Sequence, residues 1–423
     1  MNAPNFRFRM PLLLWFTVTF FFAFQFILRL SVGILREDIL QKFSVSTIDF
    51  GHLAGYYYLG YAGMQIPLGF MLDRYNFKLV TFIAIVTTAI GTLIFSLADY
   101  WSMILFSRFL IGAGSAVAFL SIAKVTKSFF PEKFHSFMIG FSFTIGLSGA
   151  VVGGKPLKIL FENFGYGLSL QFLSLTALLI GVVVLVINDK KIEKIQSHTE
   201  DVISIKQTFK LIFNPTILLI GLFGGLMVGS LEGFADVWSM TFFSHIYHYS
   251  EHDSISAASI LYIGMCVGGP VLAFFAKKFH SNILMIIFTG ILTSIIFLIL
   301  FSNENMSYIS IVILMFCLGI LCCYQVLVFT LTTQLVSRSC AGLSIAIINC
   351  INMSFGHFFH IIISNIMQNN WNGMVNERNN QVYDMATYII GLAPIPIFCL
   401  VGTAGFVFLS YLQRKSKFKI IEL

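Results

Sequence analysis

The feature that most constrains this chain is a series of apolar runs, each about 20 residues long, that recurs along its whole length. A helix of that length crosses the hydrocarbon layer of a membrane. The runs lie near residues 10–34, 48–71, 78–98, 101–124, 134–155, 167–188, 213–240, 254–276, 282–302, 308–334, 340–366 and 385–412. The sequence therefore predicts an all-α membrane protein with twelve transmembrane helices.

The charge content agrees with this prediction. Charged residues make up 11% of the 423 residues, whereas a soluble domain carries about 25%. The first apolar run, from Met10 to Leu28, exceeds the apolar core of about 7–15 residues found in a secretory signal. We expect it to be retained as the first transmembrane helix.

The apolar runs form two groups of six, and the most highly charged stretch of the chain lies between them. This division predicts an N-terminal bundle over 1–188, a cytoplasmic linker over 189–210 and a C-terminal bundle over 211–423. A weak internal repeat supports two related halves, because residues 66–69 (IPLG) recur loosely as residues 269–272 (GPVL). Two six-helix bundles related by a pseudo-two-fold axis are a known transporter architecture.

The Lys and Arg residues are distributed unequally between the two sides of the predicted membrane protein. Most of the 26 fall on the side of the termini and the linker, which places both termini in the cytoplasm. This bias also accounts for the net charge of +7 without a nucleic-acid partner. The seven cysteines form no CxxC pair, and we expect them to be small buried residues that form no disulfide.

Two charged patterns interrupt the apolar runs. The first lies in the stretch 60–78 (GYAGMQIPLGFMLDRYNFK), where we expect the helix to break at Pro67 and Gly69 and to enter a short charged turn at a membrane face. The second is residues 105–116 (LFSRFLIGAGSA), which place Arg108 before a run of small residues.

Together these patterns resemble the major facilitator superfamily of transporters, and the resemblance covers nearly the whole chain. Stretches such as residues 26–35 (FILRLSVGIL) and 233–243 (GFADVWSMTFF) are similar to a bacterial branch related to lysosomal dipeptide transporters. The resemblance implies a multi-pass protein of the bacterial inner membrane that is not an enzyme. It also implies a cytoplasmic gate that locks the two halves and is formed by Gly69, Asp73, Arg74 and Lys78.

The chain departs from the superfamily at one position of this gate. The superfamily has a glycine two residues after the position of Arg74, and this chain has Asn76. We expect Asn76 to take the same left-handed turn, because asparagine tolerates that conformation.

Ionisable residues inside the predicted spans are costly and usually functional, and we single out Arg29, Arg108, Glu232 and Asp236. Asp236 lies one helical turn after Glu232 on the same face. The resemblance implies that the helices that carry these residues line a central cavity. They would suit a zwitterion, with arginine for its carboxylate and an acidic side chain for its ammonium.

Other interpretations of the four charges remain open. Arg–Glu pairs would form an external gate, and Glu232 would serve as a proton carrier, since burial favours its protonated form. Alternatively, the charged groups snorkel to the membrane surface from the ends of their helices.

Uncharged polar residues are weaker candidates, because they either line the cavity or form ordinary contacts between helices. Of the tyrosines at positions 57, 58 and 61, we take the first and third as candidates. The full set is Tyr57, Tyr61, Gln325, Asn349, Asn352 and His357. Histidines 245, 248 and 252 have spacings that would suit metal capture, but coincidence in a wet loop is favoured, so we expect no metal site.

We therefore expect a secondary active transporter that moves a small polar solute (an amino acid, a short peptide or an organic anion) by alternating access. Symport with protons is one form of coupling considered, and we expect a monomer in the lipid bilayer without a cofactor. The sequence contains no GxxxxGK[ST] pattern, which argues against a nucleotide-driven pump. The alternatives are a transport-inactive sensor or receptor, and an intramembrane enzyme that uses Ser115 and His357.

Overall fold

The computed structural model describes residues 9–187, 205–303, 305–337, 340–375 and 380–414. The N-terminal bundle contains six membrane-spanning segments. They are α1 (Arg9–Ile34), α3 (Thr47–Arg74), α4 (Phe77–Ser96), α5 (Trp101–Ser115) continued by α6 (Val117–Phe129), α7 (Glu132–Val152) and α9 (Tyr166–Val186).

The C-terminal bundle contains six further spanning segments. They are α12 (Pro215–Leu226) continued by η1 (Gly229–Trp238) and α13 (Ser239–Ile246), α14 (Glu251–Lys278), α15 (Asn282–Ser302), α16 (Tyr308–Cys322) continued by α17 (Tyr324–Thr333), α18 (Ala341–Asn369), and α19 (Met385–Leu392) continued by α20 (Pro394–Arg414). The predicted twelve-helix fold of two bundles is confirmed.

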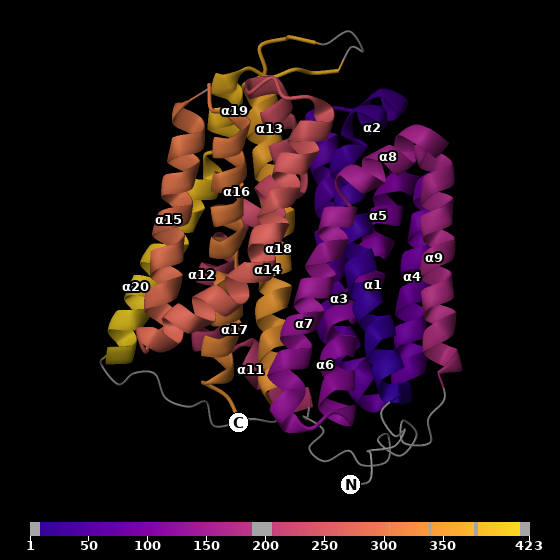
Figure 1. Cartoon of the computed structure of the whole chain (residues 1–423), viewed down its shortest axis with the longest axis vertical. Coiled ribbons are helices and arrows are strands. Elements are labelled where there is room, and N and C mark those ends of the chain that lie inside the picture. The colour runs from indigo at the N-terminus through magenta and orange to yellow at the C-terminus, as the bar shows by residue number, and fades with distance from the viewer. Residues whose placement is uncertain (1–8, 188–204, 304, 338–339, 376–379, 415–423) are drawn as a thin grey trace.

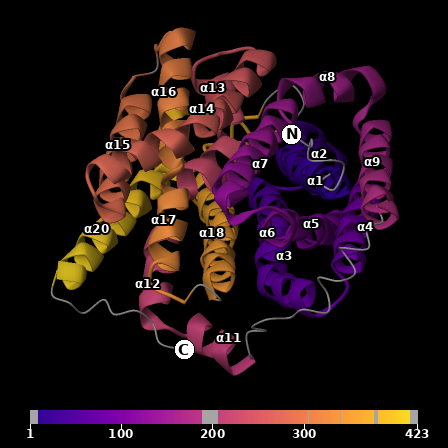
Figure 2. The ribbon, with the colours of Figure 1, turned by 60° about the horizontal axis from the view of Figure 1, so that its bottom comes forward.

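Three short helices are not among the predicted spans: α2 (Arg36–Phe43), α8 (Lys155–Phe164) and α11 (Ile205–Ile212). The two bundles stand side by side, with α2, α8 and α19 at one end and α11 with the end of α20 at the other (Figures 1 and 2). We call the first end the distal side and the second the terminal side. The predicted linker lies largely outside the described residues, so the bundle boundaries at 188 and 211 stay predictions.

Eleven of the twelve spanning segments are long and apolar enough to cross a membrane by composition alone. The twelfth is α3, a 28-residue helix whose apolar character is diluted by Asp49, His52 and Gln65. This helix packs against α5 of its own bundle and against α18 of the other. Its polar residues are therefore compatible with its place at the seam between the bundles.

The prediction that the helix breaks at Pro67 and Gly69 is wrong. Helix α3 continues through both residues to Arg74, just as α14 continues through Pro270. A membrane helix tolerates an internal proline because neighbouring helices and local adjustments satisfy the freed backbone groups. Both prolines lie inside 28-residue helices, in line with the sequence repeat.

The left-handed turn expected at Asn76 is also wrong. Asn76 has φ of −57°, and its side chain accepts a hydrogen bond from the backbone N–H of Leu79. It therefore caps the start of α4, where backbone donors lack partners within the helix. Tyr75 and Asn76 alone connect α3 to α4.

Equivalent close contacts between helices occur in both bundles. A Cβ atom on Gly112 of α5 would collide with the carbonyl of Tyr57 on α3, and one on Gly319 of α16 would collide with the carbonyl of Leu261 on α14. Small residues at such points let two helical backbones approach closely. The recurrence of this contact reflects the pseudo-two-fold relation between the bundles.

Candidate functional site

Both acidic candidates lie in η1, a π-helical stretch of ten residues. It begins after α12 ends at Leu226, where the backbone N–H groups of Leu231 and Glu232 both donate to the carbonyl of Val228. All ten residues of η1 are buried. Stretches of π-helix are rare and occur frequently at functional sites. This wider winding carries Glu232 and Asp236 to the seam between the bundles.

Arg29 of α1 joins the two carboxylates across that seam. Its Nε donates to Oδ2 of Asp236 at 2.5 Å, and its Nη2 donates to Oε2 of Glu232. The exposed fractions of the three residues are 6% for Arg29, 1% for Glu232 and 1% for Asp236. Snorkelling to the membrane surface is therefore excluded for these residues, and the charges form a buried group between the bundles.

Two tyrosines complete the hydrogen bonding of Asp236. Tyr58 of α3 and Tyr262 of α14 each donate a hydroxyl to the carboxylate, the latter at 2.5 Å. The hydroxyl of Tyr58 also lies 3.2 Å from the backbone carbonyl of Glu232. Sequence reasoning preferred Tyr57 and Tyr61 over Tyr58 and missed Tyr262, because no local pattern distinguishes a tyrosine that meets the other bundle.

Arg108 of α5 supports α1 instead of reaching a carboxylate. It is buried, and its guanidinium donates to the backbone carbonyls of Leu28 at 3.0 Å and Arg29 at 3.3 Å. Its guanidinium carbon lies 5.0 Å from the centre of the Tyr57 ring, whose hydroxyl donates to Gln25 at 2.5 Å. Snorkelling is excluded for Arg108 as well.

The uncharged candidates are only partly gathered around this group. Gln325 lies beside Glu232, and Asn349 lies beside Tyr61. Asn352 is buried, and neither atom of its amide has a hydrogen-bond partner among the described residues.

His357 is not brought to the group. It lies beside Gly55, with its ring 6.4 Å from the ring of Tyr56. The neighbouring His360 is the histidine that approaches, since its ring centre lies 5.3 Å from that of Tyr58.

The histidines considered for metal capture face different partners. His245 contacts the carbonyl of Thr241 and the hydroxyl of Tyr388, whereas His252 lies 3.5 Å from Glu162. Within the described ranges, no three His, Cys, Asp or Glu side chains are placed to share a metal ion.

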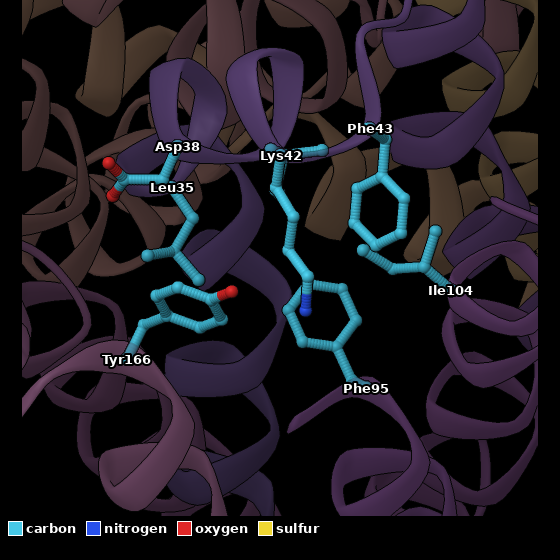
Figure 3. Close-up of a pocket in the computed structure, with 8 residues that line it drawn as sticks. Leu35, Asp38, Lys42, Phe43, Phe95, Ile104 and Tyr166 are labelled. Atoms are coloured by element: carbon cyan, nitrogen blue, oxygen red, sulfur yellow. The ribbon is translucent and has the colours of Figure 1, made fainter. Parts of the chain in front are cut away.

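A small hollow lies between α2 and the distal ends of α4, α5 and α9 (Figure 3). Lys42 extends into it, and its ammonium donates to the backbone carbonyl of Ala98 at 2.7 Å. The lining is otherwise largely apolar and includes Phe43, Phe95 and Tyr166. Because the ammonium is already bonded to the backbone, we assign Lys42 the role of fastening α2 to the N-terminal bundle.

The model of the Major Facilitator Superfamily matches residues 14–359 of the chain. The chain belongs to the Major Facilitator Superfamily. The narrower resemblance to the lysosomal dipeptide transporter branch stays a prediction.

Two curated relatives carry the names of transporters. The uncharacterized transporter YybO of Bacillus subtilis is 23% identical over 279 residues, which cover 60% of this chain and 63% of that protein. The probable galactarate/D-glucarate transporter GarP of Escherichia coli is 25% identical over 128 residues, or 29% of this chain and 28% of that protein. The chain thus spans less than two thirds of these relatives.

Solved structures agree with the fold over nearly the whole chain. A bacterial homolog of the human lysosomal transporter Spinster, inward-facing and occupied, has a TM-score of 0.68 and 16% identity, with 96% of this chain and 98% of that chain covered. A mutant form of the nucleoside transporter NupG has a TM-score of 0.72 and 12% identity, covering 93% of this chain and 100% of that chain. At these identities the likeness is one of fold. The matched superfamily members are membrane transporters and not enzymes.

The predicted gate residues around the α3–α4 connection make their contacts inside the N-terminal bundle. Asp73 pairs with Lys124 of α6 at 2.6 Å, and Lys78 donates to the carbonyl of Ile187 at 3.0 Å. The guanidinium carbon of Arg74 lies 3.8 Å from the ring centre of Phe70. A Cβ atom on Gly69 would meet nothing within 4 Å. The role of these residues as a gate that locks the two bundles together stays a prediction.

The ion pairs that join the N-terminal and C-terminal bundles lie toward the distal side. Besides Arg29 with its two carboxylates, Lys158 of α8 pairs with Glu251 of α14 at 2.5 Å, and His252 approaches Glu162. Among the described residues, no ion pair joins the bundles at the terminal side.

Proposed function

We propose that this chain is a secondary active transporter that moves a small polar solute by alternating access. The observation that carries the proposal is the buried pairing of Arg29 in one bundle with Glu232 and Asp236 in the other. Such a pairing stabilises the approach of the bundles, and a solute with matching charges competes for the same groups. The names of the matched relatives support transport.

The charges favour a zwitterion, such as an amino acid or a short peptide, over an organic anion. The buried group contains Arg29, Arg108, Glu232 and Asp236, whose formal charges cancel. A zwitterion replaces one ion pair with two, because its carboxylate pairs with arginine and its ammonium with an acidic side chain. A dianion would pair with the arginines only, and the two protein carboxylates would then have no cationic partner.

Proton coupling enters the proposal through Glu232. Asp236 receives hydrogen bonds from Arg29, Tyr58 and Tyr262, whereas the carboxylate of Glu232 is bonded to Arg29 and lies beside Tyr58 and Gln325. The carboxylate with fewer donors is more readily protonated when Arg29 leaves it. We therefore assign the proton to Glu232, in symport with the solute.

Tyr57, Tyr61, Gln325, Asn349 and Asn352 supply uncharged hydrogen-bonding groups around this centre in the proposal. The site of action is the bacterial inner membrane, with both termini and the gate residues Gly69, Asp73, Arg74 and Lys78 in the cytoplasm. The ion pairs on the distal side then close the outer face, and the protein works as a monomer.

The experiment is uptake by purified protein in proteoliposomes, with labelled amino acids, dipeptides and galactarate supplied with and without an inward proton gradient. We expect uptake of a zwitterion that the gradient accelerates. Glu232→Gln and Arg108→Lys should each lower uptake by at least about tenfold. The first removes a negative charge from the site, and the second removes the guanidinium that donates two hydrogen bonds. Lys133→Gln, an exposed change on α7, is the control. Wild-type uptake by correctly inserted Glu232→Gln and Arg108→Lys proteins would contradict the site assignment.

A further inference from the structure

A second buried arginine lies at the distal seam, outside the group that carries the proposed function. Arg36 begins α2 and has an exposed fraction of 2%. Its guanidinium carbon lies 5.6 Å from the ring centre of Phe50 in the N-terminal bundle and 5.9 Å from that of Trp238 in the C-terminal bundle. The side chain is therefore held between aromatic rings of both bundles.

In the part of the chain that the structure describes, no acidic side chain pairs with Arg36. Among the ion pairs of the described residues, none includes Arg36. Its one side-chain hydrogen bond, from Nη2 to the hydroxyl of Thr47, is long at 3.4 Å. Burying a cation without an opposite charge is strongly unfavourable, and contacts with aromatic faces offset only part of that cost.

The polar groups around Arg36 that lack a partner are donors. The Nε–H of Arg36 and the indole N–H of Trp238 are both buried and have no hydrogen-bond partner in the described part of the chain. The hydroxyl of Thr47, which accepts from Arg36, lies 2.6 Å from the hydroxyl of Tyr383, and the latter also lies 2.9 Å from Oε1 of Gln381. A group of buried donors beside an unneutralised cation calls for an acceptor that carries negative charge.

We propose that Arg36, Thr47 and Trp238 form a binding site for a small anion, of the size of chloride or of a single carboxylate group. A water molecule satisfies N–H donors, but it leaves the charge of Arg36 unbalanced, so the chemistry favours an anion. The site is distinct from the group around Arg29, because a different arginine and a different aromatic pair form it.

The site joins the two bundles, which gives anion binding a conformational effect. Arg36 and Thr47 belong to the N-terminal bundle, whereas Trp238 belongs to the C-terminal bundle. Arg36 lies beside both Thr47 and Trp238 only while the distal ends of the bundles are together. A bound anion therefore stabilises that arrangement by its differential affinity for it.

Thermal unfolding of the purified full-length protein in detergent tests this site without any transport assay. Sodium chloride and sodium formate are each titrated against sodium gluconate at constant ionic strength, so that chloride and carboxylate are separate arms and the bulky gluconate is the reference. We expect the unfolding temperature to rise with saturation in at least one arm.

The variants decide whether the effect belongs to this site. Arg36→Gln should abolish the rise, and Trp238→Phe, which removes one donor to a charged group, should weaken the apparent anion affinity by about tenfold. Lys133→Gln should behave as wild type. Trp238→Phe keeps the test decisive if Arg36→Gln fails to fold. No saturable rise in the wild type, or an equal rise in Arg36→Gln or Trp238→Phe, would overturn the proposal.

Discussion

The hydroxyl of Tyr58 and the carboxylate of Asp236 form a hydrogen bond between bundles, and the two residues are separated by 178 positions in the chain. The same carboxylate accepts from Arg29, also of the N-terminal bundle, and from Tyr262 of its own bundle. Asp236 is thus a meeting point of three helices besides its own.

Arg29→Gln should destabilise the protein strongly, because it leaves two carboxylates buried without their cation. Removal of one partner from a buried ion pair costs about 3–5 kcal/mol. We expect a large fall in the unfolding temperature in detergent. The triple variant Arg29→Gln, Glu232→Gln, Asp236→Asn should recover much of it, because neutral side chains then replace Arg29 and both carboxylates that it pairs with. A triple variant less stable than Arg29→Gln alone would contradict the account.

Tyr58→Phe and Tyr57→Phe should differ although the residues are adjacent. The hydroxyl of Tyr58 reaches the other bundle, whereas that of Tyr57 donates to Gln25 in its own bundle. A hydrogen bond to a charged group contributes about 1.5–3 kcal/mol, so Tyr58→Phe should favour opening of the distal seam roughly tenfold or more. Hydrogen exchange at the distal ends of α1 and α3 measures the opening. Equal exchange in both variants would argue against this role for Tyr58.

Gly112→Ala should be far more harmful than Gly69→Ala. A Cβ atom at position 112 collides with the carbonyl of Tyr57, but one at position 69 meets nothing within 4 Å. Overpacking of a close contact costs about 1–3 kcal/mol. The unfolding temperature should therefore fall for Gly112→Ala and stay near that of the wild type for Gly69→Ala. The opposite order would mean that the approach of α3 and α5 is misplaced.

Carbodiimide coupling should link Lys158 to Glu251, since this reagent joins amines and carboxylates that are in contact. Their charged atoms lie 2.5 Å apart and belong to different bundles. If the bundles must separate at the distal side during transport, the link should abolish uptake. The pair Lys42 and Asp99, whose charged atoms lie 3.8 Å apart within the N-terminal bundle, is the control, because its link spans no moving seam. Full uptake by protein linked at Lys158 would contradict alternating access of this kind.

The start of α19 should respond to acid through Asp384. Its pKa lies below the usual value because its carboxylate accepts hydrogen bonds from Thr387, as the cap of that helix. A lowered pKa means that this stabilisation is complete above the unfolded value of about 3.9 and is lost as the pH falls through the lower folded value. Hydrogen exchange in α19, corrected for intrinsic rates, should rise in that range. Asp384→Asn, which keeps a cap without titrating, should lack this acid response.

The fold could be predicted from the sequence because each apolar run has about the length that a membrane-spanning helix needs. Even α3, which is less apolar than the other spanning helices, stood out by its position between two clear runs. The charged candidates could be selected for the same reason, because Arg29, Glu232 and Asp236 interrupt runs that otherwise contain few charges.

The partners of that site could not be predicted in the same way. Tyr58 and Tyr262 differ from other tyrosines only in the direction that they face, which depends on how the bundles meet. The position of Arg36 was hidden similarly, since its aromatic neighbours come from both bundles. The local sequence pattern indicates whether a residue lies in the membrane, whereas the packing of distant segments determines which residues it contacts.

The π-helical winding of η1 leaves this membrane helix able to lengthen without adding residues. A π-helical stretch uses more residues for each turn than an α-helix, so ten residues span a shorter length of helix than they would in α-helical form. Rewinding part of η1 would turn Glu232 and Asp236 away from Arg29 and lengthen the helix, while most backbone groups exchanged one helical partner for another. The chain therefore contains a means to rotate its two acidic side chains inside a membrane without unfolding the segment that carries them.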